Sequence, residues 1–93
     1  MDYKLRWSDE SIRNLEEVLA DISRKWTLKE VDNFKNKLKL QLQMIISHPH
    51  MFPRSQSNPK LRKAVLSKQT TIFYEIKYDT ISIIHIHLNK KRA

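Results

Sequence analysis

The absence of glycine constrains this chain more than any other feature of its 93 residues. Loops that cradle phosphate groups, dinucleotide-binding turns and the nucleophile elbow of serine hydrolases all need glycine, because their backbone takes a positive φ or closely approaches a ligand. The chain also has no cysteine, which excludes disulfides, cysteine-based zinc modules, iron–sulfur clusters and thiol nucleophiles. We therefore expect a function carried by surface side chains, with no cofactor.

The length allows a single small domain, which we predict to span residues 1–93. A core of that size leaves little room for a large ligand cavity. No apolar run approaches the roughly 18 residues of a membrane span, and Asp2, Lys4 and Arg6 come too early for the apolar stretch of a signal peptide. We therefore expect a cytoplasmic protein that has no membrane partner.

Positive charge is concentrated in the second part of the chain. Residues 1–32 carry 6 basic and 8 acidic side chains, net −2, whereas residues 33–93 carry 12 basic and 2 acidic, net +10. A field of this sign concentrates polyanions near the surface, so nucleic acid or an acidic protein is the expected partner. A solubilising surface is the simpler explanation of the same charge.

The spacing of apolar residues predicts a helix of roughly 17 residues directly after Ser8. Ser8 is a suitable N-cap, Asp9 and Glu10 place negative charge in the first turn, and Trp7 can pack against Ile12. The predicted buried stripe consists of Ile12, Leu15, Leu19, Ile22 and Trp26.

A second helix is predicted to begin within a residue or two of the end of the first. Thr27 and Glu30 have the spacing of a capping box, and so short a joint favours a helical hairpin. The helix should end near Ser47, because Pro49 disfavours helical geometry at His48. Its predicted buried stripe consists of Val31, Phe34, Leu38, Leu42 and Ile45.

The remaining segments favour an antiparallel sheet. Residues 3–7 alternate apolar and polar side chains as a short strand does, and a proline-containing loop is expected at residues 48–60. Three segments rich in β-formers follow it, at residues 61–66, 70–78 and 80–88. The last turn should lie near Asp79, because aspartate tolerates a positive φ. We therefore predict an α+β fold: an N-terminal strand, a two-helix hairpin, then a three-stranded antiparallel meander packed under the helices.

Strand alternation divides the side chains of the last segment between two faces. The face under the helices is predicted to hold Ser82, Ile84, Ile86 and Leu88. The exposed face is predicted to hold Ile81, Ile83, His85 and His87. The two histidines should therefore lie side by side on the exposed face.

Candidates for chemistry lie in the basic second part of the chain. Cleavage of RNA by its 2′-hydroxyl needs a base, a positive charge beside the developing oxyanion and an acid for the leaving oxygen. Side chains that can supply these groups are Arg62, Lys63, Tyr74, His85, His87, Lys90, Lys91 and Arg92. The simpler explanations are that Arg62 and Lys63 are solvated, that Tyr74 belongs to the core and that the three C-terminal cations form a solvated tail.

A metal site is not favoured by the same sequence. Pairs of histidines separated by one residue occur at 48–50 and 85–87, and on a strand such a pair projects both imidazoles from one face. No carboxylate lies near either pair in sequence, and a catalytic metal normally has a third well-placed protein ligand. We therefore predict no metal site and assign the first pair to closing the second helix.

Five short motifs follow one another along nearly the whole chain. They are residues 3–8 (YKLRWS), Trp26, His48 with Pro49, residues 61–63 (LRK) and residues 71–76 (TIFYEI). In this order they resemble the RelE/ParE superfamily of bacterial toxins. The resemblance implies a helical hairpin on a small antiparallel sheet. It also implies the toxin half of a type II toxin–antitoxin module, held inactive by a cognate antitoxin that is usually acidic.

The resemblance also implies two alternative targets. RelE-like members cleave mRNA in the ribosomal A site with basic residues and a tyrosine or histidine, whereas ParE-like members lack that set and poison DNA gyrase. We expect the first activity, a metal-independent endoribonuclease whose partners are the ribosome and mRNA. Few lysines precede Arg62, and this favours the gyrase inhibitor as the alternative. A third reading is an inactive toxin fold that only binds its partner.

Residue roles follow from the resemblance together with the chemistry of the side chains. Arg62 matches the family's arginine at the start of the second strand, and His87 lies near the position of a catalytic histidine or tyrosine. The expected catalytic residues are Arg62, His85 and His87. The expected RNA- or phosphate-binding residues are Lys63, Lys90, Lys91 and Arg54.

Overall fold

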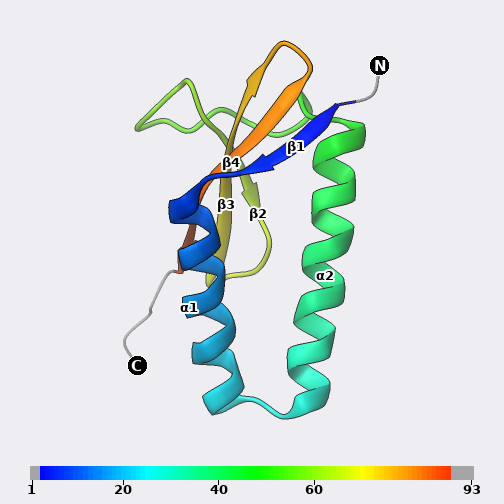
Figure 1. The fold of residues 1–93 in the computed structure, drawn as a ribbon, viewed down its shortest axis with the longest axis vertical. Coiled ribbons are helices and arrows are strands. Elements are labelled where there is room, and N and C mark those ends of the chain that lie inside the picture. The colour runs from blue at the N-terminus through cyan, green and yellow to red at the C-terminus, as the bar shows by residue number, and fades with distance from the viewer. Residues whose placement is uncertain (1–2, 89–93) are drawn as a thin grey trace.

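The computed structural model describes residues 3–88, which form a four-stranded sheet and two helices (Figure 1). In chain order the elements are β1 (Lys4–Trp7), α1 (Asp9–Lys25), α2 (Leu28–Ser47), β2 (Arg62–Val65), β3 (Thr70–Lys77) and β4 (Thr80–Leu88). The predicted α+β fold is therefore confirmed, including the antiparallel meander of β2, β3 and β4. The sequence did not indicate that β1 pairs in parallel with β4, which makes the sheet mixed, in the order β1-β4-β3-β2.

Helix α1 begins at the predicted N-cap. The Ser8 hydroxyl accepts a hydrogen bond from the Ser11 N–H (3.0 Å) and donates one to the Ile84 carbonyl (2.6 Å), so the cap also ties the helix to β4. The predicted stripe was wrong at its start, because Ile12 is 45% exposed and Ser11 is buried in its place. Burial of Ser11 is tolerated because its hydroxyl donates to the Ser8 carbonyl (2.8 Å). Ile22 is buried as predicted.

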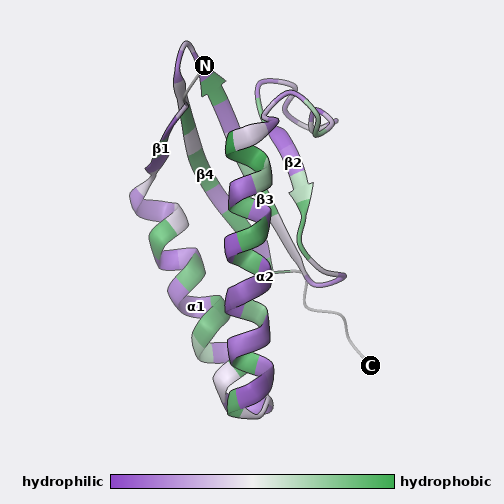
Figure 2. Cartoon of the chain, turned by 90° about the vertical axis from the view of Figure 1, so that its right-hand side faces the viewer, coloured by the Kyte–Doolittle hydropathy of each residue, from purple (hydrophilic) through white to green (hydrophobic). Residues whose placement is uncertain are grey.

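Helix α2 has both the predicted start and the predicted end. The capping box is complete, since the Glu30 N–H donates to the Thr27 hydroxyl (3.2 Å) and the Thr27 N–H donates to the Glu30 carboxylate (3.0 Å). The helix ends at Ser47, and His48 has a non-helical backbone (φ −138°, ψ 63°) ahead of Pro49. Its predicted stripe is buried or half-buried throughout, and Figure 2 shows hydrophobic and hydrophilic residues alternating around it.

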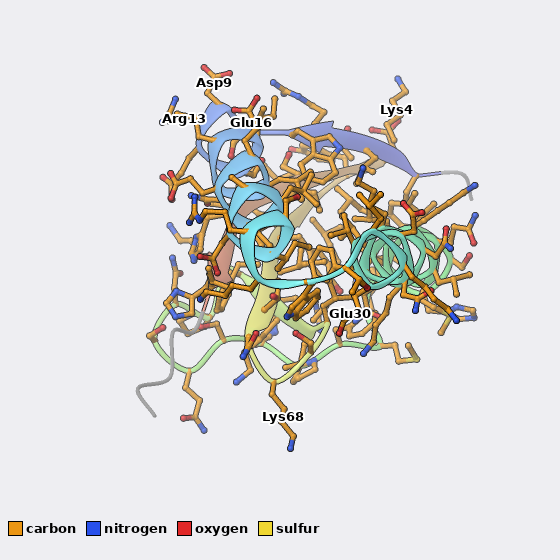
Figure 3. All side chains as sticks on the ribbon, turned by 90° about the horizontal axis from the view of Figure 1, so that it is seen from below. Lys4, Asp9, Arg13, Glu16, Glu30 and Lys68 are labelled. Atoms are coloured by element: carbon orange, nitrogen blue, oxygen red, sulfur yellow. The ribbon has the colours of Figure 1, made fainter. Side chains whose placement is uncertain are left out.

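The core lies between the two helices and one face of the sheet, which we call the inner face. Its largest fully buried side chains are Tyr74, Ile45, Ile72, Ile81, Ile83 and Val18. Figure 3 looks along the helices from their connecting turn, and the labelled side chains of Lys4, Asp9 and Lys68 point away from this interior. Within residues 3–88, neither helix is apolar enough over a sufficient length to cross a membrane.

A β-bulge in β4 corrects the predicted assignment of its faces. Phe73 pairs with His85, whereas Tyr74 pairs with Ile83, so Ile84 has no partner in β3. One extra residue reverses the alternation. Ile81 and Ile83, predicted to be exposed, are therefore fully buried, and Ile84, predicted to be buried, is not. Beyond the bulge the prediction holds.

The turn between β3 and β4 differs from the prediction by one residue. Tyr78, rather than Asp79, has the positive φ, at 55°. Asp79 instead stabilises the turn with polar contacts, because its carbonyl accepts from the Lys4 N–H (2.8 Å) and its carboxylate accepts from the Thr80 hydroxyl (3.1 Å). The side chain of Tyr78 is left 96% exposed.

Candidate functional site

The sheet face opposite the helices carries most of the polar strand residues, and we call it the open face. Register and alternation place on it the charged and ring side chains of Lys4, Arg6, Lys63, Phe73, Glu75, Lys77, His85 and His87. None of these residues is buried. Four cations against one carboxylate make the open face positive, which attracts polyanions.

Three candidate side chains, Lys63, His85 and His87, lie close together on the open face. Phe73 pairs with Lys63 on one side and with His85 on the other, so the three form a row across β2, β3 and β4. The rings of Phe73 and His85 are stacked, with centroids 4.5 Å apart and planes 29° apart. His87 lies in the next row, opposite Thr71. The structure therefore brings Lys63, His85 and His87 onto one accessible surface.

Arg62 lies on the opposite face from these residues. It pairs with Tyr74, whose side chain is in the core, and neighbouring residues of a strand point to opposite faces. Its Nη1 donates to the carbonyls of Phe52 (2.7 Å) and His50 (3.3 Å), which belong to the loop after α2. The structure therefore separates Arg62 from His85 and His87.

Tyr74 is a core residue, as the simpler explanation held. It has no exposed surface, and its hydroxyl donates to the Pro49 carbonyl (2.6 Å). The ring meets Phe52 edge to face, with centroids 6.2 Å apart. Burial raises the pKa of Tyr74 to about 12, although the charge of Arg62 acts in the opposite direction. Because the phenol is fully enclosed, a substrate on the surface cannot reach it to exchange a proton.

Arg54 and Arg62 line a separate cavity of about 280 Å³, which we call the loop cavity. The loop of residues 48–61 forms one side of it, and the turn between β3 and β4 forms the other. Its lining residues are His50, Arg54, Pro59, Lys60, Arg62, Ile76 and Tyr78. No short-range sequence pattern links the loop to the turn, so the sequence did not indicate that His50, Lys60 and Tyr78 line this cavity.

A larger groove, of about 450 Å³, runs between α1 and the part of β4 beyond its pairing with β1. The two histidines of β4 reach it, and so do Glu10, Glu17 and Asp21 of α1. Asn14 fixes the free edge of the strand, because its side-chain oxygen accepts from the Ile86 N–H (3.0 Å). Over residues 3–88 there is no group of three or more histidine or carboxylate side chains that could hold a metal ion. The expected sites Lys90 and Lys91 lie outside the described residues.

Comparison with known proteins defines the fold. No protein-family model and no curated protein matches the sequence. A solved structure of the chromosomal ParDE toxin–antitoxin system from P. aeruginosa matches with a TM-score of 0.78 at 13% identity, over 95% of this chain and 97% of that chain. The chain has the RelE/ParE-like toxin fold. This is the fold that the sequence motifs resembled.

Two further solved structures share the RelE/ParE-like toxin fold. The E. coli DinJ-YafQ toxin–antitoxin complex matches with a TM-score of 0.66 at 16% identity, over 95% of this chain and 93% of that chain. A mutant of the E. coli toxin RelE in the free state matches with a TM-score of 0.58 at 18% identity, over 95% of this chain and 84% of that chain. Identities this low establish the shared fold, and the function has to be argued from the residues of this chain.

Proposed function

We propose that this chain is the toxin half of a type II toxin–antitoxin module and that it cleaves RNA on its open face. The observation that carries the proposal is the row of Lys63, Phe73 and His85, with His87 beside it, on the face away from the helices. Structures with the same fold are described as a ParDE system, a DinJ-YafQ complex and the toxin RelE, which supports the toxin role.

These side chains supply the groups that RNA cleavage requires. One imidazole, neutral at Nδ1 or Nε2, takes the proton of the 2′-hydroxyl as its oxygen attacks phosphorus. The other, as imidazolium, protonates the 5′-oxygen as its bond to phosphorus breaks, which leaves a 2′,3′-cyclic phosphate. Imidazole can act as a general base or, once protonated, as a general acid, so either histidine can take either role. Lys63 adds positive charge for the developing oxyanion, and Phe73 offers a ring against which a base can stack.

The shape of the open face supports a role for the ribosome. The histidines lie on a sheet surface, and the groove beside α1 reaches them from one edge only. Such a surface cannot by itself hold a flexible strand in a reactive geometry, which requires the reacting atoms to be about 3–3.5 Å apart. In this proposal the ribosome holds the mRNA, and the toxin contributes acid, base and positive charge.

Induced expression in bacteria, with pulse labelling of protein and DNA synthesis, tests the proposal. We expect the unmodified chain to stop protein synthesis rapidly. A variant with His85→Gln and His87→Gln should lose this effect, and one with Lys35→Ala and Lys39→Ala, two exposed positions of α2, should keep it. Arrest of protein synthesis by the histidine variant, at equal expression and solubility, would contradict the proposal.

Inhibition of DNA gyrase is the second candidate, and the position of Arg62 favours it. Arg62 is bonded to two loop carbonyls on the far side of the sheet from the histidines. Among the described residues, Lys63 is therefore the one cation in the row that contains His85, and RNA cleavage would have less positive charge available there. In this case DNA synthesis would stop, cells would form filaments, and the histidine variant would remain toxic. Purified gyrase should then lose supercoiling activity in the presence of the chain.

We also propose an acidic antitoxin as the partner of this chain. The ParDE and DinJ-YafQ structures are described as toxin–antitoxin assemblies, and a net charge of +8 favours an acidic protein. Co-expression with the product of an adjacent small open reading frame should restore growth and give a stable complex. Purification of the chain as a stable and harmless monomer would argue against this partner.

A further inference from the structure

The loop cavity gathers cations that have no acidic counterpart. Arg54, Lys60, Arg62 and His50 all line it, and no carboxylate does so among residues 3–88. The ion pairs of the described chain involve Lys4, Arg24 and Lys25 instead. Three like charges around one cavity of about 280 Å³ repel one another, and a bound anion would remove that repulsion.

The cavity is held in shape by the fold before any ligand binds. Within the loop the Ser55 N–H donates to the Leu61 carbonyl (2.8 Å), and the Lys63 N–H of β2 donates to the Pro53 carbonyl of the loop (2.9 Å). Arg54 Nη1 donates to the Pro59 carbonyl (3.2 Å). A preformed loop loses little conformational freedom on binding, which favours affinity.

The guanidinium groups of this cavity keep donors for a ligand. Arg62 and Arg54 each use Nη1 for their carbonyl bonds, while a guanidinium has five N–H donors in a planar fork. Within the described residues, Nε and Nη2 of both arginines have no protein partner. A planar fork of N–H groups matches the oxygens of a phosphate group.

An aromatic ring stands at the rim of the same cavity. Tyr78 lines the cavity and yet remains 96% exposed. Its φ of 55° is unfavourable for a bulky residue, and the bonds of Asp79 to β1 and Thr80 hold the turn in this form. A cationic site beside an exposed ring is the combination with which proteins bind the phosphate and the base of a nucleotide.

We propose that the loop cavity binds a nucleoside phosphate, with the phosphate between Arg54, Lys60 and Arg62 and the base stacked on Tyr78. The volume of about 280 Å³ lies just below the range of cavities that enclose a whole drug-sized ligand, so the phosphate enters and the base stays at the rim. A free mononucleotide and the phosphorylated end of an RNA strand share this chemistry. The site lies apart from the open face and does not depend on the proposed RNA cleavage.

Calorimetric titration of the full-length chain tests this site with four probes. They are AMP, adenosine, inorganic phosphate and a 5′-phosphorylated RNA trinucleotide. We expect AMP to bind more tightly than adenosine or phosphate. The Arg54→Ala and Lys60→Ala double variant should bind AMP at least about tenfold more weakly. Tyr78→Ala should lower the affinity for AMP by about fivefold or more, since stacking on the base is lost. It should leave the affinity for inorganic phosphate unchanged.

The control is the double variant with Lys35→Ala and Lys39→Ala, which removes the same charge from exposed positions of α2. It should bind AMP as the unmodified chain does. Arg54 and Lys60 are also exposed, so their replacement should leave the fold intact, as circular dichroism would verify. Equal AMP affinity in the two double variants, or equal binding of adenosine and AMP, would overturn the proposal. Tighter binding of AMP than of the trinucleotide assigns the site to free nucleotides, and the reverse assigns it to strand ends.

Discussion

Tyr74 joins the sheet to the segment that follows α2 through a single hydroxyl group. Its hydroxyl donates to the carbonyl of Pro49 (2.6 Å), and both residues are buried. Replacement by phenylalanine leaves that carbonyl without a donor, so we expect Tyr74→Phe to lower the free energy of unfolding by about 1–3 kcal/mol. Urea denaturation measures the change. Tyr78→Phe is the control, because that side chain is 96% exposed, and its effect should stay within about 0.5 kcal/mol.

The same phenol predicts a loss of stability at alkaline pH. Its pKa rises from 10.0 in the unfolded chain to about 12 in the fold, because burial disfavours the phenolate. Between these values the unfolded chain releases the proton and the folded chain keeps it, so stability falls as pH rises. The free energy of unfolding is unaffected by the titration of this group below pH 10, and about 2–3 kcal/mol of it is lost by pH 12. The stability gap between the unmodified chain and Tyr74→Phe should therefore shrink over this range, and a gap independent of pH would contradict the shift.

Arg62 and Lys63 show what residue-level prediction could and could not provide. Their cationic chemistry was visible in the sequence, but their positions on opposite faces of the sheet were not predicted, although neighbouring residues of a strand point to opposite sides. The sequence could not show that Arg62 bonds to the carbonyls of His50 and Phe52, because a loop with three prolines has no periodic pattern. For the same reason the meeting of Lys60 and Tyr78 at one cavity was not predicted.

At the scale of elements, Ser8 contributes more than a helix cap. Ser8→Ala removes the acceptor for the Ser11 N–H and also the donor to the Ile84 carbonyl at the bulge. Thr27→Ala removes a cap at the exposed start of α2, which should cost about 0.5–2 kcal/mol. We expect Ser8→Ala to cost about 1 kcal/mol more than that, since a second hydrogen bond is lost. Denaturant titration of both variants gives the difference, and equal losses would show that the contact with Ile84 adds no stability.

Features that depend on consecutive residues, such as the ends of the helices, were predicted from the sequence. Features that depend on pairing between distant segments, such as the bulge in β4, were not. Both helices carry their caps and apolar periods in consecutive residues, so their ends could be predicted closely. The bulge at Ile84 depends on how β4 meets β3 and on the hydroxyl of Ser8 far away in sequence. A run such as residues 81–86, which is apolar at most positions, does not indicate where an extra residue interrupts the alternation.

Across the whole molecule, positive charge is concentrated on the open face and around the loop cavity. Helix α1 carries acidic side chains such as Asp9 and Glu16, and Figure 3 shows them on the opposite side of the molecule from Lys68. The open face carries four cations and one carboxylate, and the loop cavity has cations at a second place. A polyanion is therefore attracted to the open face and to the loop cavity, and the α1 carboxylates beside His85 and His87 limit this attraction at one edge of the open face.

This distribution predicts how RNA binding depends on salt. Each phosphate contact on single-stranded nucleic acid contributes about 0.7 to the slope of log affinity against log salt concentration. Lys63→Ala with Lys77→Ala, both exposed on the open face, should therefore reduce that slope by about 1.4. Fluorescence anisotropy with a short single-stranded RNA, over a series of salt concentrations, measures it. Lys35→Ala with Lys39→Ala removes the same net charge from α2. An equal reduction in both double variants would mean that RNA responds to the total charge of the molecule and that the open face is not its binding surface.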